Sequence, residues 1–518
     1  MNRNTVRWGF CVCAVVCGFF VLATCDDFNR PLEDDIEFYR SVTPVTSWAE
    51  LQSAAEGAAG PGLIGLAGDI ELDSAAKTIN ITRPLTITGF EGRRVIRRAA
   101  VSPFKDPLFR VNAGGGLTLG HPQGGTLVLD GGAVWNDAHD ATNTGVTATA
   151  PLVSVDGGAL TLQDGAVLQN NDQSAGNGGG VFVDASVYSA VFTMTGGTIG
   201  GNSASVDGGG VFVYASGGNV TFTMKDGTIS DNNASGNGGG VFVDASVYSA
   251  VFTMKGGTIS GNSAGYGGGV SVRGGVFTMG GDAAVSGNSA GYAGGGVSVQ
   301  GGVFTMGGDA AVSGNSGGSG GGGVYFFEGS LEMSGGTIGG NSAGNGGGVF
   351  VDASVYSAVF TMTGGTIGGN SASVDGGGVV VYASGGNVTF TMKDGTINGN
   401  NASADGGGVY VFYSTFEMNG GTISGNSAGS FGGGVFVYAS GGIFKKVPET
   451  AEGTSGVIYG SNEGEASNLV KDGSGNPEDD KGHAVYVNSG PKKRDSTVRE
   501  DEELDSTYAG SIPGGGWE

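Results

Sequence analysis

The chain has 518 residues and a formal net charge of −24, with 110 glycines and only 12 prolines. This acidic balance argues against nucleic acid or anionic lipid headgroups as partners. The glycines recur at regular intervals among Val, Ile, Phe and Met, and disordered chains lack such apolar order, so the composition also argues against a disordered protein.

The N-terminus has the layout of a secretory signal. Arg3 and Arg7 precede an apolar run over residues 10–23. This run is too short, and too close to the N-terminus, to favour a permanent membrane span. The four cysteines are at positions 11, 13, 17 and 25, so a chain cleaved before Cys25 would contain no disulfide.

The sequence LATC at residues 22–25 is followed by an acidic stretch. It resembles the lipobox of a bacterial lipoprotein signal, in which cleavage precedes the cysteine and the cysteine carries a lipid. The resemblance implies a signal peptide over 1–24, lipidation of Cys25 and an acidic tether over 25–45. Thr24 departs from the small residue that usually precedes the cysteine, and the alternative is an ordinary secretory signal with incidental cysteines.

Residues 46–160 are predicted to form an N-terminal cap and the first coils of the fold. Ser47 and Glu50 form a capping box, which predicts a short helix over SWAELQSAAEGA. The apolar runs GLIGLAGDIEL and KTINITRPLTITGFEG are typical of strands. A helix over the first coil would cover its unpaired strand edges.

A glycine-rich block recurs over residues 161–444. One copy, at 178–207, reads GGGVFVDASVYSAVFTMTGGTIGGNSASVD, and the starts of successive GGG tripeptides are 25 to 30 residues apart. A fixed period of this size is the signature of stacked structural repeats, each of which is buried against its neighbours.

Apolar residues alternate within each block, as they do in strands. In VFV the two valines are expected to point inward, because they hardly vary between copies. In FTM and GGTI, Phe192, Met194 and Ile199 are expected inside. Three short strands, with Gly, Asn and Ser at the corners, predict an all-β fold: a right-handed parallel β-helix of roughly 14–17 three-strand coils with a short N-terminal capping helix.

Asparagine recurs at one corner, three residues after an Ile or Val. Stacked asparagine amides can hydrogen-bond along a column and satisfy the backbone groups of the corner. Asparagine also tolerates the left-handed backbone that a sharp corner requires. A structural ladder is therefore predicted in preference to a polar binding row. Its members are Asn202, Asn232, Asn262, Asn288, Asn315, Asn341, Asn370, Asn400 and Asn426.

The middle residue of VFV accepts Phe, Tyr, Val and Ser, so we expect it to be exposed. It would form a ladder of rings on one face, interrupted at Ser271 and Ser298. An exposed aromatic stripe is typical of a contact surface, and aromatic faces suit sugar rings and protein partners. The alternative is that the rings only stack on each other and stabilise the fold. The candidate binding face comprises Phe182, Phe212, Phe242, Tyr325, Phe350, Tyr410 and Phe436.

The block also resembles a known repeat. GGTI followed by I-x-x-N, as at residues 256–262, is similar to the paired GGAI and FxxN repeats of chlamydial polymorphic outer-membrane proteins, and to repeat lipoproteins of treponeme-type spirochaetes. The resemblance covers about residues 160–430 and implies a right-handed parallel β-helix with an adhesive role. The chain departs from that family in having Ile or Val where the family has Phe.

Parallel β-helices include polysaccharide lyases and glycosidases, which need paired carboxylates, or calcium ligands with a basic residue. The aspartates of the repeats occupy copied positions, and are interpreted as turn residues. The polar cluster with Asp137, His139 and Asp140 is interpreted as an exposed loop, and the arginines at 93–98 as a solvated rim. No catalytic residue, metal site or cofactor is predicted, and we expect a protein that is not an enzyme.

Residues 445–490 are predicted to form the last coils, and 491–518 a polar tail. Together these features predict a surface-exposed, lipid-anchored protein of the outer membrane that acts as an adhesin or antigen. Its expected partners are the membrane, through the N-terminal lipid, and a host protein or glycan, with no nucleic acid. The alternatives are a polysaccharide lyase or glycoside hydrolase, and a passive structural spacer of the cell envelope.

Overall fold

The computed structural model describes residues 37–73, 76–99, 104–133, 147–245, 248–438, 441–446, 457–459, 467–477, 484–488, 491–494 and 502–505. The chain divides into two units, Met1–Thr43 and Pro44–Glu518, and the solenoid lies in the second. Cys25 and the loop with Asp137, His139 and Asp140 lie outside the described residues, so the predictions about them stay predictions.

Each repeat block folds as one turn of a parallel β-solenoid. In the turn that begins at residue 178, β15 (Val181–Ala185) leads to the long β16 (Ala190–Gly200), and β17 (Ser203–Ala204) closes the turn. Each strand pairs in parallel with its copy in the next turn, with Val181 opposite Val211. The predicted all-β fold is confirmed, and only 3% of the structure is helical.

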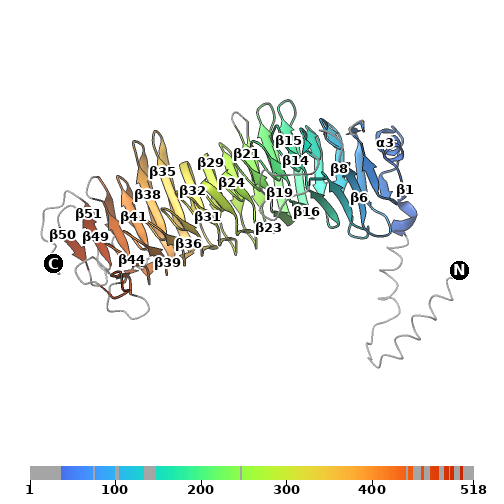
Figure 1. The fold of residues 1–518 in the computed structure, drawn as a ribbon. Coiled ribbons are helices and arrows are strands. Elements are labelled where there is room, and N and C mark those ends of the chain that lie inside the picture. Colours follow the sequence, from blue (N-terminus) through green and yellow to red (C-terminus); the bar gives the residue numbers. More distant parts are fainter. Residues whose placement is uncertain are drawn as a thin grey trace, which may run out of the picture. The chain divides into compact units, whose positions relative to one another are not determined.

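Three stacks of parallel strands form the sides of the solenoid, and a fourth stack of short strands completes each turn (Figure 1). The first stack contains β4 (Ile79–Ile81), β7 (Phe109–Asn112), β11 (Val153–Asp156), β15, β18 (Val211–Ala215), β21 (Val241–Asp244), β25 (Val270–Arg273), β29 (Val297–Met306), β32 (Val324–Met333), β35 (Val349–Ala353), β38 (Val379–Ala383), β41 (Val409–Phe412), β45 (Val435–Val437) and β49 (Val485–Asn488). The second contains β2 (Leu63–Leu66), β5 (Pro84–Gly89), β8 (Gly116–Leu119), β12 (Ala159–Leu162), β16, β19 (Val220–Ser230), β22 (Ala250–Met254), β26 (Val276–Met279), the later parts of β29 and β32, β36 (Ser357–Gly368), β39 (Asn387–Asn398), β42 (Thr415–Met418) and β46 (Ile443–Lys446).

The third stack contains β3 (Ile70–Leu72), β6 (Arg94–Arg98), β9 (Leu127–Asp130), β13 (Ala166–Gln169), the later parts of β16 and β19, β23 (Thr258–Ser260), β27 (Ala284–Ser286), β30 (Ala311–Ser313), β33 (Thr337–Gly339), the later parts of β36 and β39, β43 (Thr422–Ser424) and β47 (Val457–Ile458). The fourth contains β10 (Thr147–Ala148), β14 (Asp172–Gln173), β17, β20 (Asn233–Ala234), β24 (Ser263–Tyr266), β28 (Ser289–Ala293), β31 (Ser316–Gly317), β34 (Ser342–Ala343), β37 (Ser371–Ala372), β40 (Asn401–Ala402), β44 (Ser427–Ala428) and β48 (Leu469–Val470). This fourth strand was not expected from the sequence.

The solenoid has about 12 turns, fewer than the predicted number. The fourth stack contains 12 strands, one for each complete turn, and incomplete turns flank them at both ends. The prediction was too high because loops lengthen the terminal turns. Val485 pairs with Val435, which lies 50 positions earlier, whereas Val211 pairs with Val181, only 30 positions earlier.

The GGG tripeptide is explained by the close approach of consecutive turns. Gly178 has φ +70°, in the left-handed region that favours glycine. A side chain on Gly179 would meet the carbonyl of Gly209 in the next turn, and one on Gly180 would meet the side chain of Ile199. Backbone conformation therefore requires the first glycine, and lack of space requires the other two.

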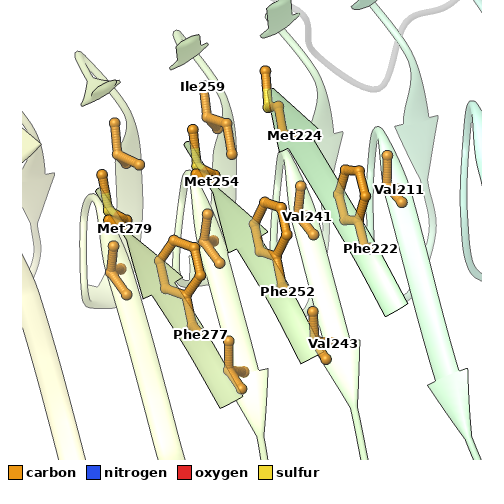
Figure 2. Packing of buried hydrophobic residues seen from close by; sticks show 14 of the residues in the cluster. Val211, Phe222, Met224, Val241, Val243, Phe252, Met254, Ile259, Phe277 and Met279 are labelled. Carbon is orange, nitrogen blue, oxygen red and sulfur yellow. The ribbon is translucent and has the colours of Figure 1, made fainter. Parts of the chain in front are cut away.

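The core is a set of stacked apolar columns inside the solenoid. Phe222, Phe252 and Phe277 are fully buried, with ring centroids 4.4 and 4.9 Å apart, and Figure 2 shows these rings on successive strands beside a column of methionines. The inward orientation predicted for FTM and GGTI is confirmed, since Met194 and Ile199 are also fully buried. Each such side chain stabilises the fold by about 1.5–3 kcal/mol, so every turn contributes its own share.

The N-terminal cap contains α3 (Trp48–Glu56), after β1 (Thr43–Val45). Ser47 Oγ accepts a hydrogen bond from Glu50 N at 3.3 Å, as a capping box requires. The carboxylate of Glu50 accepts from the backbone N–H of Thr46, one residue before the expected position, and this bond lowers the pKa of Glu50. Leu51 packs into the core, so the helix covers the first coil.

Two strands lie within the segment that we predict as a polar tail. The strand β50 (Pro491–Arg494) pairs antiparallel with β49, and β51 (Glu502–Asp505) pairs antiparallel with β46. They cover the edges of the last strands of the first two stacks. Within the described part of the chain, no helix is long and apolar enough to cross a membrane.

Candidate functional site

The nine asparagines predicted to form a ladder lie buried at one corner of successive turns. The backbone N–H and the Nδ2 of Asn202 both donate to Asn232 Oδ1 at 3.0 Å, and the same pattern recurs along the column. The Nδ2 also donates to a carbonyl of the preceding turn, as Asn232 does to Ile199 O at 3.0 Å. Because these amides are fully paired within the protein, they stabilise the corner and have no free groups for a ligand.

The ladder is longer than the sequence indicated. Asn171 and Asn468 add one step at each end. Beyond Asn171, Arg98 Nη1 donates to its Oδ1, while Arg98 Nη2 donates to the backbone oxygens of Asp106 and Pro151, each at 3.0 Å. Arg98 was expected in a solvated rim, and this is wrong: it is fully buried among these acceptors, and burial lowers its pKa to about 9.

The middle residues of the VFV segments form a column outside the core, which we name the outer column. The prediction that they are exposed is wrong. Phe212, Phe242 and Phe436 have exposed fractions of 4%, 2% and 1%, and Tyr410 is also buried. The other predicted members, Phe182, Tyr325 and Phe350, are half-buried. In order, the outer column contains Phe182, Phe212, Phe242, Ser271, Ser298, Tyr325, Phe350, Val380, Tyr410 and Phe436.

Two neighbouring columns cover the outer column, which explains its burial. The strand flank lies two residues further along each strand, on the same outward side, and Phe212 is 6.0 Å from Tyr214 between ring centroids. The corner flank lies just before each GGG. The strand flank contains Asp184, Tyr214, Asp244, Arg273, Gln300, Phe327, Asp352, Tyr382, Phe412 and Tyr438. The corner flank contains Asp207, Asn237, Tyr266, Ala293, Gly320, Asn345, Asp375, Asp405 and Phe431.

The outer column is interrupted where two successive turns have serine instead of a ring, and a pocket opens there. Ser271 and Ser298 lie between Phe242 and Tyr325, so the column lacks two rings in a row. The resulting cavity has a volume of about 290 Å³. Its lining comes from the outer column, both flanks and the core residue Val272: Asn237, Phe242, Tyr266, Ser271, Val272, Arg273, Ser298, Gln300, Tyr325 and Phe327.

An ion pair lies beside the pocket. Arg273 Nε donates to Asp244 Oδ1 at 3.0 Å and Arg273 Nη2 donates to Asp244 Oδ2, and this contact raises the pKa of Arg273. The same guanidinium lies over the ring of Phe242, 5.4 Å from its centroid. At the other end, Tyr325 Oη donates to Asp352 Oδ2 at 3.3 Å, and burial raises the pKa of both groups.

Several polar groups of the pocket are available to a ligand. Ser271 and Ser298 are each only 5% exposed. Within the part of the chain that the structure describes, their hydroxyls and the amide of Gln300 have no hydrogen-bond partner in the protein. Nearly buried polar groups cost free energy unless a ligand or water satisfies them. The site therefore combines aromatic end walls with unsatisfied donors and acceptors, which is the usual composition of a small-molecule pocket.

The residues that line the pocket include no carboxyl group. None of its ten lining residues is Asp, Glu or His, and hydrolysis of a glycosidic bond requires two carboxyl groups across the cleft. Among the described residues, no group of three or more His, Cys, Asp or Glu side chains is arranged to hold a metal ion.

A second feature of the sequence, the length of one loop, also marks the position of this pocket. The turns of Ser271 and Ser298 also have a shorter loop between their first two strands. The segment DASVYSA of the 178–207 block is replaced by RGG at 273–275 and by QGG at 300–302. Two consecutive turns thus lose both the ring and the loop, and such a paired departure marks a place where a repeat builds something different.

The strand pairings establish a parallel β-solenoid, the fold that the resemblance to chlamydial polymorphic outer-membrane proteins implies. A relationship to that family or to spirochaete lipoproteins stays a prediction. No family model, no curated protein and no solved structure matches the chain.

Proposed function

We propose that this protein is a lipid-anchored adhesin of the cell envelope, and that it binds its ligand in the pocket between Phe242 and Tyr325. The observation that carries the proposal is the pocket itself, with nearly buried and unpaired serine hydroxyls between two aromatic walls. A host or cell-surface glycan, or the surface of a host protein, is the ligand class that fits the proposal.

The rest of the outer column supports binding over a passive spacer. A spacer needs only that each turn packs on the next, and rings or valine occupy the outer column in its eight other turns from Phe182 to Phe436. Before Phe182 the same register holds Ser154, which hydrogen-bonds to Asp156 and does not line the pocket. The two serine turns give up that packing in succession. The polar residues Asn237, Arg273 and Gln300 gather at the same place, which a spacer would not require.

The anchor is proposed from the sequence LATC and the acidic stretch that follows it. Replacing Cys25 with Ala should release the protein from membranes and abolish its labelling by radioactive palmitate. A Cys25→Ala variant that stays as membrane-bound and as strongly labelled as the parent would contradict this part of the proposal.

A filling experiment tests the binding site. The double substitution Ser271→Phe/Ser298→Phe fills the gap in the outer column with phenylalanine, the residue that already occupies this column at Phe212 and Phe242. The parent and the double variant, each as the purified chain from residue 26 onward, are compared on arrays of glycans and extracellular-matrix proteins. We expect the double variant to lose at least about tenfold in affinity for the ligands of the parent, because the rings occupy the cavity.

The matched control is Val380→Phe, which adds a ring to the same column outside the pocket. It should bind as the parent does, and circular dichroism and thermal unfolding verify that all variants are folded. Equal binding by the parent and the filled variant would show that the pocket is not the site. No binding by the parent would favour a spacer, and turnover of an arrayed glycan would favour an enzyme.

A further inference from the structure

The size of the pocket limits its occupant to something small. Its volume of about 290 Å³ lies at the lower limit of ligand pockets, which range from about 300 to 1,000 Å³. Phe242 and Tyr325 are three strand spacings apart in the column, and each spacing is about 4.8 Å. One six-membered ring with its substituents fits between these walls, whereas a folded protein segment does not.

The charge of the pocket excludes strongly ionic ligands. Arg273 is the only charged lining residue, and Asp244 neutralises it through two hydrogen bonds. A carboxylate, phosphate or sulfate would need an unpaired cation to repay its desolvation, and a cationic ligand would need an unpaired carboxylate. The lining supplies neither.

The polar groups instead suit a ligand with many hydroxyls. Ser271 and Ser298 can each donate and accept, and the amide of Gln300 adds two donors and one acceptor. Asn237 Nδ2 is already committed to Asp207 Oδ1 at 2.8 Å. Neutral groups of mixed polarity recognise hydroxyls, which also donate and accept at once.

Aromatic rings surround these groups on several sides. Phe242 and Tyr325 are the end members of two interrupted runs of rings, and each has an aromatic partner of the outer column on one side only. Tyr266 stands at the rim, 41% exposed and stacked on Tyr292 at 5.2 Å. A pyranose has an apolar C–H face and a hydroxyl-bearing edge, so it can pack on a ring while its hydroxyls bond to the serines and glutamine.

From these four features we infer that the pocket binds one uncharged hexopyranose unit, such as the terminal sugar of a glycan. The inference rests on the proposed function and specifies its ligand. The ion pair between Arg273 and Asp244 sets the preference for a neutral sugar. Because Asp244 neutralises the guanidinium of Arg273, the pocket presents no unpaired cation to an anionic sugar.

Calorimetry or ligand-observed NMR with the chain from residue 26 onward tests the inference. The probes are the methyl glycosides of glucose, galactose and mannose, together with their charged counterparts methyl glucuronide and methyl glucosaminide. We expect at least one neutral glycoside to bind with a Kd on the order of 1 mM, and both charged counterparts to bind at least about tenfold more weakly. The filled variant Ser271→Phe/Ser298→Phe should not bind the neutral glycoside.

A charge variant separates recognition from mere packing. Asp244→Asn leaves Arg273 unpaired, so it should increase the affinity for methyl glucuronide at least about fivefold, an effect that a loss of stability would not produce. Stronger binding of a charged sugar than of its neutral counterpart by the parent would overturn the inference, as would neutral-sugar binding that the filled variant retains.

The two proposals fail separately. If the array ligands depend on the pocket but none of the neutral glycosides binds, the inference about the sugar is wrong while the proposed binding site stands. If the filled variant retains all array binding as well, the proposed site itself is wrong.

Discussion

The inner and outer aromatic columns contain the same kinds of residue under different constraints. Inside the core, the rings of Phe192, Phe222 and Phe252 lie 4.4 Å apart at each step and within 15° of parallel. In the outer column, the first three rings are 5.2 and 5.5 Å apart and are tilted by 50° and 37°. The inner column keeps Phe or Leu in every repeat, whereas the outer column also accepts Val and Ser.

The difference follows from what encloses each column. The inner column lies among other closely packed apolar columns inside the solenoid, so a smaller residue leaves a cavity that cannot collapse. Only side chains of the two flanks cover the outer column, and these can differ from turn to turn. A solenoid can therefore open a pocket in its outer column without weakening the core that holds its turns together.

Removing an inner ring should have the largest effect. Phe277 is fully buried between Phe252 and Phe304, with ring centroids 4.9 and 5.0 Å away. Phe277→Ala should reduce the free energy of unfolding by about 3–5 kcal/mol, because it combines lost burial with an enclosed cavity. Chemical denaturation followed by circular dichroism measures the loss. A loss below about 1 kcal/mol would show that the inner column can collapse, and would remove the contrast with the outer one.

Breaking the asparagine ladder should have the next largest effect. Asn315 Oδ1 accepts from the backbone N–H and the Nδ2 of Asn288, at 2.9 and 3.0 Å. In Asn315→Ala the backbone N–H of Asn288 stays buried without an acceptor, and its Nδ2 keeps only the bond to Ile259 O at 2.9 Å, which together should cost about 2–4 kcal/mol. Hydrogen exchange should locate the loss at this corner, with faster exchange of the Asn288 amide. Unchanged protection there would mean that water replaces the missing acceptor.

An outer ring should matter less than an inner one. Phe212→Ser should cost about 1–3 kcal/mol, since the ring is buried but the flanks above it can close over the gap. The same denaturation measurement compares it directly with Phe277→Ala. A cost equal to that of the inner variant would show that both columns are equally enclosed.

The chain offers its own control for this comparison. Segments 177–229 and 345–397 are identical except at one position, which is Phe212 in the first segment and Val380 in the second. Because the surroundings are so similar, Val380→Phe should change the free energy of unfolding by less than about 1 kcal/mol. A larger loss would mean that the neighbouring turns, which do differ, decide what fits in the outer column.

Most of the fold could be predicted from the repeat. The alternation in VFV and FTM, and the constancy of the valines between copies, identify the inward residues correctly. The fourth strand could not be predicted, because Ser203–Ala204 is too short to show any alternation. Asn171 follows Leu168 and not an Ile or Val, so the pattern that predicts the ladder does not include it. Insertions hide Asn468 and lengthen the last turns.

The candidate site could be predicted only in part. The sequence identifies the outer column and its interruption at Ser271 and Ser298, but not that the column is buried. Burial depends on residues two positions further along the strand, such as Tyr214, and on residues before the next GGG, such as Tyr266. These residues cover the outer column by packing beside it, across neighbouring turns. Comparing the residues at one position of the repeat does not reveal which side chains from other positions lie next to it.

The smallest predicted effect concerns pH and distinguishes the outer column from the inner one. Asp405, in the corner flank, is a partly buried carboxyl group, and Asp375 lies directly beneath it in the same flank. Burial, and then the charge of Asp375, raises the pKa of Asp405 to about 6. Among the described residues, the apolar core contains only hydrophobic side chains, so this response to pH belongs to the cover of the outer column and not to the core.

The sign follows from proton linkage. The carboxyl has a higher pKa in the folded protein than in the unfolded chain, where it is about 4. The folded state therefore holds more protons between about pH 4 and pH 6, and stability falls as the pH rises through this window. Asp405→Asn removes the contribution of this carboxyl group to the pH dependence, and asparagine already occupies this flank at Asn237 and Asn345. The variant should match the parent near pH 4 and exceed it at pH 7 by about 1 kcal/mol or less, since solvent screens a partly exposed charge. Thermal unfolding of both proteins from pH 4 to pH 7 measures this. Parallel curves, or a parent more stable at pH 7, would show that Asp405 is ionised in the folded protein at no cost.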